Sequence, residues 1–216
     1  MESVAVITAQ PNFPGMDYWN PIEEAITLVH EIAHSFGAIH VTHENTLMYP
    51  TTGTLAYKFD KVNKYIFESM SKNYFAEDKT QRTQQYINTL IEMNKDSYRN
   101  NLPVLSVIYE IIYEDNYSEV AMSSTTEELN KHIKNMIQDS SYALAVMGVS
   151  EFNLNNWDQS IELLSEAVKL NPGLAEANWY LGKAYDKVGK GNEADKYKKI
   201  AKPFSNNWIV DNKLFY

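Results

Sequence analysis

The sequence predicts a mainly α-helical protein with a short α+β part near its N-terminal end. Three observations support this. Four of the seven prolines and four of the five histidines lie in the first 50 residues, and the remainder is rich in Glu, Lys, Asn, Leu and Ile. In that remainder, apolar residues recur at spacings of three and four, as on one face of an α-helix. Near the C-terminal end, the sequence resembles itself at an interval of 34 residues.

Composition excludes several classes of protein. The 216 residues are 44% hydrophobic and 22% charged, which is ordinary for a globular protein and excludes disorder and collagen. The absence of cysteine excludes disulfides, thiolate ligands and a thiol nucleophile. A net charge of -9 disfavours binding to nucleic acid or to anionic lipid. No apolar run approaches the roughly 18 residues of a membrane span. The first residues lack the features of a signal peptide, and the sequence does not identify the compartment of the protein.

The first elements are a strand and an amphipathic helix. The β-branched run Ser3–Thr8 predicts a strand, because it stops before a loop that contains two prolines. Asn20 and Pro21 are typical of an N-cap followed by the first residue of a helix. Apolar residues then recur at helical spacing up to residue 36, and Gly37 follows. We therefore expect a helix over 21–36 that ends at this glycine.

The rest of the chain predicts helices with short connections. Thr125 and Glu128 have the spacing of a capping box, which places a helix start at Thr125. The helices expected between the first one and the self-similar region, from their apolar periodicity, cover 59–72, 77–95, 103–116 and 125–138.

The self-similar region begins near residue 141. Gly148 and Gly182 are 34 residues apart, and Pro172 closes the first unit. The segment Ala175–Tyr185 closely follows the pattern of the tetratricopeptide repeat, which this region resembles. The resemblance implies pairs of antiparallel helices, with small residues where the two helices cross.

The first copy of this repeat departs from the pattern at two positions. Glu151 stands where an aromatic residue is usual, and Ser160 stands where alanine is usual. Since three repeats are normally needed for stability, one interpretation makes 103–138 a third, degenerate unit.

The segment with the clearest chemistry begins in the first helix. His30 and His34 are four residues apart, so both imidazoles can face one point. Gly37 lets the chain leave the helix in a left-handed conformation, which can bring back His40 as a third nitrogen ligand. Three histidines leave one position of a zinc ion open, as in catalytic zinc sites, and Glu31 can accept the proton of a metal-bound water. Chance gives this pattern on the order of once in 10⁵ chains of this length.

This segment resembles the metzincin zinc metallopeptidases, whose pattern is HExxHxxGxxH followed by a methionine turn. Met48 follows His40 by eight residues, and the sequence Leu47-Met48-Tyr49-Pro50 resembles the methionine turn of the matrixins. The resemblance covers about 3–72 and implies that Met48 forms an apolar floor beneath the zinc histidines. It also implies hydrolysis of peptide bonds in a peptide or protein substrate.

The sequence thus predicts three parts. Residues 1–75 form the C-terminal part of a metzincin-like domain, residues 76–140 a helical connector, and residues 141–216 the repeats with a tail. The main hypothesis is a zinc metalloendopeptidase with Glu31 as general base and a protein partner in the groove of the repeats. The alternative is a non-catalytic repeat protein with an inactive or incomplete zinc domain. Only 29 residues precede His30, which motivates this alternative.

Overall fold

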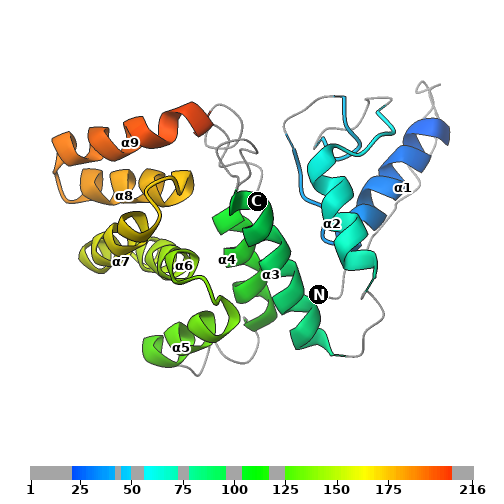
Figure 1. Cartoon of the computed structure of the whole chain (residues 1–216). Helices are drawn as coiled ribbons and strands as arrows, with labels where there is room; N and C mark the ends of the chain where they lie inside the picture. The colour runs from blue at the N-terminus through cyan, green and yellow to red at the C-terminus, as the bar shows by residue number, and fades with distance from the viewer. Residues whose placement is uncertain are drawn as a thin grey trace, which may run out of the picture. The chain divides into compact units, whose positions relative to one another are not determined.

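The computed structural model describes six stretches of the chain, namely 21–41, 45–49, 56–72, 78–95, 104–116 and 125–205. These stretches hold nine α-helices and no strand (Figure 1). The prediction of a mainly α protein is therefore confirmed. The α+β character expected for the first 75 residues has no support in the described stretches, and the strand predicted at Ser3–Thr8 lies outside them.

The chain divides into two compact units, Met1–Arg82 and Thr83–Tyr216. The first unit contains α1 (Pro21–Ser35) and α2 (Lys61–Ser71). The second unit contains most of α3 and all later helices: α3 (Lys79–Lys95), α4 (Val104–Asn116), α5 (Thr126–Met136), α6 (Ser140–Asn153), α7 (Trp157–Leu170), α8 (Ala175–Lys187) and α9 (Gly191–Ser205).

In the first unit, α1 ends as the sequence predicts. Gly37 has a φ of 87°, the left-handed region that favours glycine. The N–H groups of Gly37 and Ala38 turn back onto the carbonyls of His34 and Ala33, at 2.8 and 3.1 Å. These bonds satisfy carbonyls that the end of a helix leaves open. The chain then reverses direction, which directs residue 40 back toward the helix.

The loop after α1 is fixed to the start of α2. Asp60 caps α2, and its carboxylate accepts the N–H groups of Val62 and Asn63, both at 2.9 Å. The side chain of Asn63 is fully buried and bonds both backbone groups of Ile39. Ala38 of this loop also belongs to an apolar cluster with Ala33, Leu47 and Met48. The loop is thus held both by hydrogen bonds and by apolar packing.

In the second unit, the helices α6 to α9 form two antiparallel pairs that stack on each other (Figure 1). Gly148 on α6 faces Leu164 of α7, and a Cβ at Gly148 would lie 2.6 Å from Leu164 Cγ. A Cβ at Gly182 on α8 would lie 3.0 Å from the carbonyl oxygen of Ala194 on α9. Both glycines therefore allow two helices to approach closely, as the repeat pattern predicts.

The two departures from the repeat pattern have local explanations. Ser160 is fully buried on α7, and its hydroxyl donates a 2.8 Å hydrogen bond to the carbonyl of Gly148. Glu151 is 4% exposed and accepts a 2.7 Å bond from the side-chain amide of Asn156. Each buried polar group has a partner, so each is tolerated where a smaller or aromatic residue is usual.

The helices α4 and α5 are arranged differently from a repeat. Within the described part of the chain, each packs against α6, and the two do not pack extensively against each other. The capping box predicted at the start of α5 is present, with Thr125 and Glu128 bonded reciprocally. The helix predicted at 125–138 is therefore confirmed to within two residues. The packing gives no support to a third repeat over 103–138.

Glu176 on α8 joins the second repeat to α4. Its side chain is 2% exposed and accepts hydrogen bonds from the N–H groups of Leu105, at 2.5 Å, and Ser106, at 3.4 Å. These two residues lie in the first turn of α4, where N–H groups have no partner within the helix. Glu176 thus caps α4 from a position 71 residues further along the chain. Burial raises the pKa of this carboxyl to about 8.

We expect this carboxyl to make stability pH-dependent. Because the pKa of Glu176 is raised in the folded state, its contribution is complete below about pH 4.5 and is lost as pH rises toward 8. The free energy of unfolding of a Glu176→Gln variant should fall less over this range than that of the unchanged chain. Urea titrations at pH 5 and pH 8 measure this. Equal pH dependence in both proteins would show that Glu176 is ionised throughout.

No helix among the described residues combines the length and the apolarity that crossing a membrane requires.

Candidate functional site

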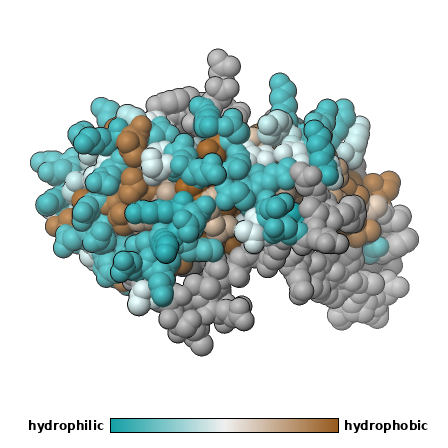
Figure 2. All heavy atoms as spheres, turned by 60° about the horizontal axis from the view of Figure 1, so that its bottom comes forward, coloured by the Kyte–Doolittle hydropathy of each residue, from teal (hydrophilic) through white to brown (hydrophobic). Residues whose placement is uncertain are grey.

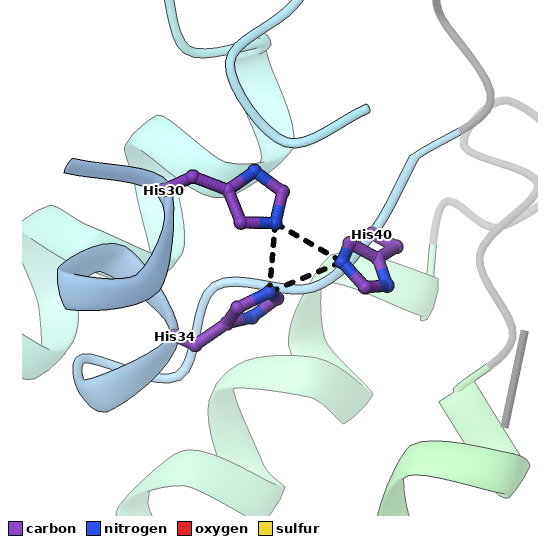
Figure 3. A group of neighbouring side chains, drawn as sticks. All are labelled: His30, His34 and His40. Carbon is purple, nitrogen blue, oxygen red and sulfur yellow. Dashed lines mark hydrogen bonds between the residues drawn. The ribbon is translucent and has the colours of Figure 1, made fainter. Parts of the chain in front are cut away.

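Three imidazoles converge in the first unit. His30 and His34 extend from α1, and His40 comes from the loop that follows Gly37 (Figure 3). The three Nε2 atoms form a triangle in which every side is 3.1 Å. The prediction that these residues face one point agrees with this arrangement. In the described part of the chain, they form the one group of histidine and acidic side chains close enough to share a metal ion.

Backbone carbonyls fix the orientation of two of the rings. Nδ1 of His30 lies 2.7 Å from the carbonyl oxygen of Leu47, and Nδ1 of His34 lies 2.8 Å from that of Ala38. A carbonyl oxygen only accepts, so Nδ1 carries the proton in both neutral rings. Nε2 of both rings is then an unprotonated acceptor. Two lone pairs that face each other at 3.1 Å repel unless a proton or a cation lies between them.

Burial favours the neutral form of two of the rings, His34 and His40. Desolvation, together with the neighbouring His34 and His30, lowers the pKa of His40 to about 4. Desolvation also lowers the pKa of His34, although the bond to Ala38 opposes this shift. Neutral imidazole is the form that binds metals, so the lowered pKa values of His34 and His40 favour metal binding.

The three nitrogens fit a tetrahedral metal ion. Ligands about 2.0–2.1 Å from zinc at tetrahedral angles are roughly 3.3 Å apart, close to the 3.1 Å found between the Nε2 atoms. Metal-binding histidines usually donate their second N–H to a carbonyl or carboxylate, as His30 and His34 do. The donor set, its spacing and its orientation therefore suit zinc.

The other predicted site residues lie near this triangle. Glu31 is half-buried on α1, and its carboxylate is not among the converging ligand atoms. Met48 is fully buried in the apolar cluster with Ala33 and Ala38, and its carbonyl accepts the N–H of Val41 at 3.0 Å. Met48 therefore belongs to the apolar interior of the first unit.

Asn63 is a supporting residue that the sequence patterns did not identify. Its side-chain oxygen accepts the N–H of Ile39 at 2.7 Å, and its amide donates to the carbonyl of Ile39 at 2.9 Å. A third bond, 2.7 Å long, joins the amide to Asp60. Asn63 thus holds the backbone directly before His40 from a helix 24 residues away. A buried asparagine in an amphipathic helix is the one feature that could have drawn attention to it.

We expect Asn63→Leu to lower stability by about 2–4 kcal/mol, because two buried backbone groups of Ile39 lose their partner. It should also weaken zinc binding about 10–100-fold, as loss of supporting contacts does in other metal sites. Chemical unfolding and competition with a fluorescent zinc chelator measure the two effects. Asn88→Ala removes an exposed asparagine on α3 and serves as the control. Unchanged zinc affinity in Asn63→Leu would show that His40 needs no such support.

Comparison with known proteins identifies the repeats. A family model described as a TPR repeat matches residues 148–189, from α6 through α7 and α8. No curated protein matches the sequence. Among solved structures, the crystal structure of MamA is similar with a TM-score of 0.35 and 17% identity. The match covers 68% of this chain and 75% of that one, and its TM-score is too low to support a shared fold or function.

These findings correct the prediction of an enzyme. The repeat match confirms the tetratricopeptide repeats, and repeats of this kind bind protein partners. The prediction of a zinc metalloendopeptidase is wrong: the family model that matches this chain is a helical repeat. The role of Glu31 as general base depended on that prediction and is withdrawn with it. The alternative hypothesis, a non-catalytic repeat protein, is the better supported one.

Proposed function

We propose that the chain binds a protein partner through the surface of the helices α6 to α9. The observation that carries this proposal is the TPR repeat match over residues 148–189. Stacked helix pairs of this kind present an extended surface, and each pair is held rigid by its neighbours. Gly148 and Gly182 support this rigidity, because they allow the two helices of each pair to approach closely.

The experiment is a selection of peptides from a random phage-displayed library against the full chain. We expect enriched peptides to bind the chain equally well with zinc added and after treatment with a chelator, because the repeats and the histidines lie in different units. Failure to enrich any peptide, or binding that disappears with the chelator, would contradict the proposal.

A second proposal concerns zinc. We infer that His30, His34 and His40 hold a zinc ion, supported by three Nε2 atoms that lie 3.1 Å apart and by carbonyl partners behind two of the rings. Bound zinc would supply a cross-link between α1 and the loop that follows it, which also contains Met48. The proposed role of zinc is therefore to stabilise the first unit.

A further inference from the structure

Positive charge gathers in the last described repeat of an acidic chain. Residues 183–202 contain three acidic residues and seven lysines, a local net charge of +4 in a chain of net charge -9. The lysines are Lys183, Lys187, Lys190, Lys196, Lys198, Lys199 and Lys202. Figure 2 shows one face of the molecule, on which hydrophilic residues cover most of the described surface and hydrophobic patches lie between them. This local excess of positive charge is opposite in sign to the net charge of the chain, so it needs a physical explanation.

Two of these lysines lie against aromatic rings. Lys183 Nζ is 5.3 Å from the ring centres of both Phe152 and Tyr180, and Lys187 Nζ is 5.6 Å from that of Trp157. The rings also contact one another, with centres 5.0 Å apart for Phe152 and Trp157 and 5.5 Å apart for Phe152 and Tyr180. We call these five residues the basic–aromatic surface. It combines helix α6, the start of α7 and helix α8.

The lysines of this surface have no acidic partner among the described residues. The ion pairs there include Lys198 with Asp186, but none for Lys183 or Lys187. Lys183 is half-buried, and desolvation lowers its pKa, as do the charges of Lys187 and Lys198. Cation–π contacts offset only part of such a cost. An anion bound here would relieve the repulsion between the lysines and replace the water that Lys183 has lost.

We propose that the basic–aromatic surface binds an acidic segment of a partner protein, with carboxylates on Lys183 and Lys187 and an aromatic or apolar side chain on the rings. This inference rests on the proposed function, since it names the kind of partner that the repeats bind. Carboxylates are complementary to two unpaired ammonium groups. Phe152 is buried, but the partly exposed rings of Trp157 and Tyr180 offer apolar area of the kind that dominates binding at protein interfaces. A partner segment rich in Glu or Asp, with interspersed aromatic residues, is complementary to both the lysines and the rings.

The test measures, by isothermal titration calorimetry, how tightly the full chain binds a synthetic peptide of ten glutamates and two tyrosines. A peptide of the same length with every glutamate replaced by glutamine is the matched ligand. We expect the acidic peptide to bind and its affinity to fall as the salt concentration rises. The glutamine peptide should bind at least about tenfold more weakly than the acidic peptide. Equal affinity for both peptides would overturn the proposal. An oligothymidylate that binds as tightly as the acidic peptide would also overturn it, since the surface would then select any polyanion.

Variants locate the binding. Lys183→Glu/Lys187→Glu should weaken acidic-peptide binding about 100-fold or more, since each lost charged contact costs about tenfold. Lys61→Glu/Lys72→Glu makes the same change in net charge at the first residue of α2 and at the residue that follows this helix, and should bind as the unchanged chain does. Lys183→Arg/Lys187→Arg keeps the charge and should retain binding, which separates loss of the site from loss of folding.

If both charge-reversed variants lose affinity equally, the effect comes from overall charge and the proposal fails. Peptides selected at random that bind while the acidic peptide does not would refute this inference and leave the proposed function intact.

Discussion

Purified without a polyhistidine tag, the full chain is expected to hold about one zinc ion and the His34→Ala variant close to none. His34 supplies one corner of the Nε2 triangle and lies 3.1 Å from both other corners. Removing it leaves two ligands, too few for a stable site. Loss of supporting contacts alone weakens a metal site about 10–100-fold, so loss of a ligand should cost at least about 100-fold. Inductively coupled plasma mass spectrometry measures the metal content.

His132→Ala is the matched control, because it removes a histidine of α5 that lies outside the converging group. Its zinc content should equal that of the unchanged chain. Zinc should also raise the melting temperature of the unchanged chain and of His132→Ala, because a ligand that binds only the folded state stabilises it. If the unchanged chain takes up no zinc even from an excess, the three histidines do not form a metal site.

The second large effect concerns the crossing of α6 and α7. We expect Gly148→Ala to lower the free energy of unfolding by about 1–3 kcal/mol, as overpacking of a core does. The new Cβ would lie 2.6 Å from Leu164 Cγ, and Leu164 is fully buried, so its side chain has little room to move. Urea unfolding followed by circular dichroism measures the change.

Gly191→Ala provides the matched control for this substitution. Gly191 also lies in a helix, but a Cβ there would meet nothing within 4 Å. Alanine is favoured over glycine in helices, so this variant should be unchanged or more stable by up to about 1 kcal/mol. If Gly148→Ala is as stable as Gly191→Ala, the close approach of α6 and α7 does not require glycine.

Local patterns in the sequence predicted the local structure well. The helix that ends at Gly37, the capping box of Thr125 and Glu128, and the two glycines of the repeats all occur as expected. Each of these features depends on residues within a few positions of one another, or on a repeat interval that is visible in the sequence. The convergence of His30, His34 and His40 belongs to the same kind, because one helical turn and one glycine reversal determine it.

Contacts between distant residues could not be predicted in this way. Asn63 holds Ile39 from 24 residues away, Glu176 caps α4 from 71 residues away, and Lys183 contacts the ring of Phe152 on another helix. Such contacts depend on how helices pack, and an asparagine, a glutamate or a lysine on a helix has the same local pattern wherever it packs. Sequence spacing therefore identified neither the support of the histidines nor the basic–aromatic surface.

The enzyme prediction failed for a related reason. The pattern from His30 to Met48 specifies where ligand atoms lie, and this requires only a helix, a reversal and a turn. Hydrolysis of a peptide bond also requires a surface that aligns the substrate with the reacting groups. That surface comes from other parts of a fold, about which the pattern contains no information. The repeat match pointed instead to a protein that binds partners.

Amide hydrogen exchange on the full chain, with and without a selected peptide, tests most directly whether the repeats bind the partner. We expect slower exchange within 140–205, the helices α6 to α9, and little change within 21–72. Protection confined to 21–72, around the histidines, would contradict binding by the repeats and place the functional surface in the first unit.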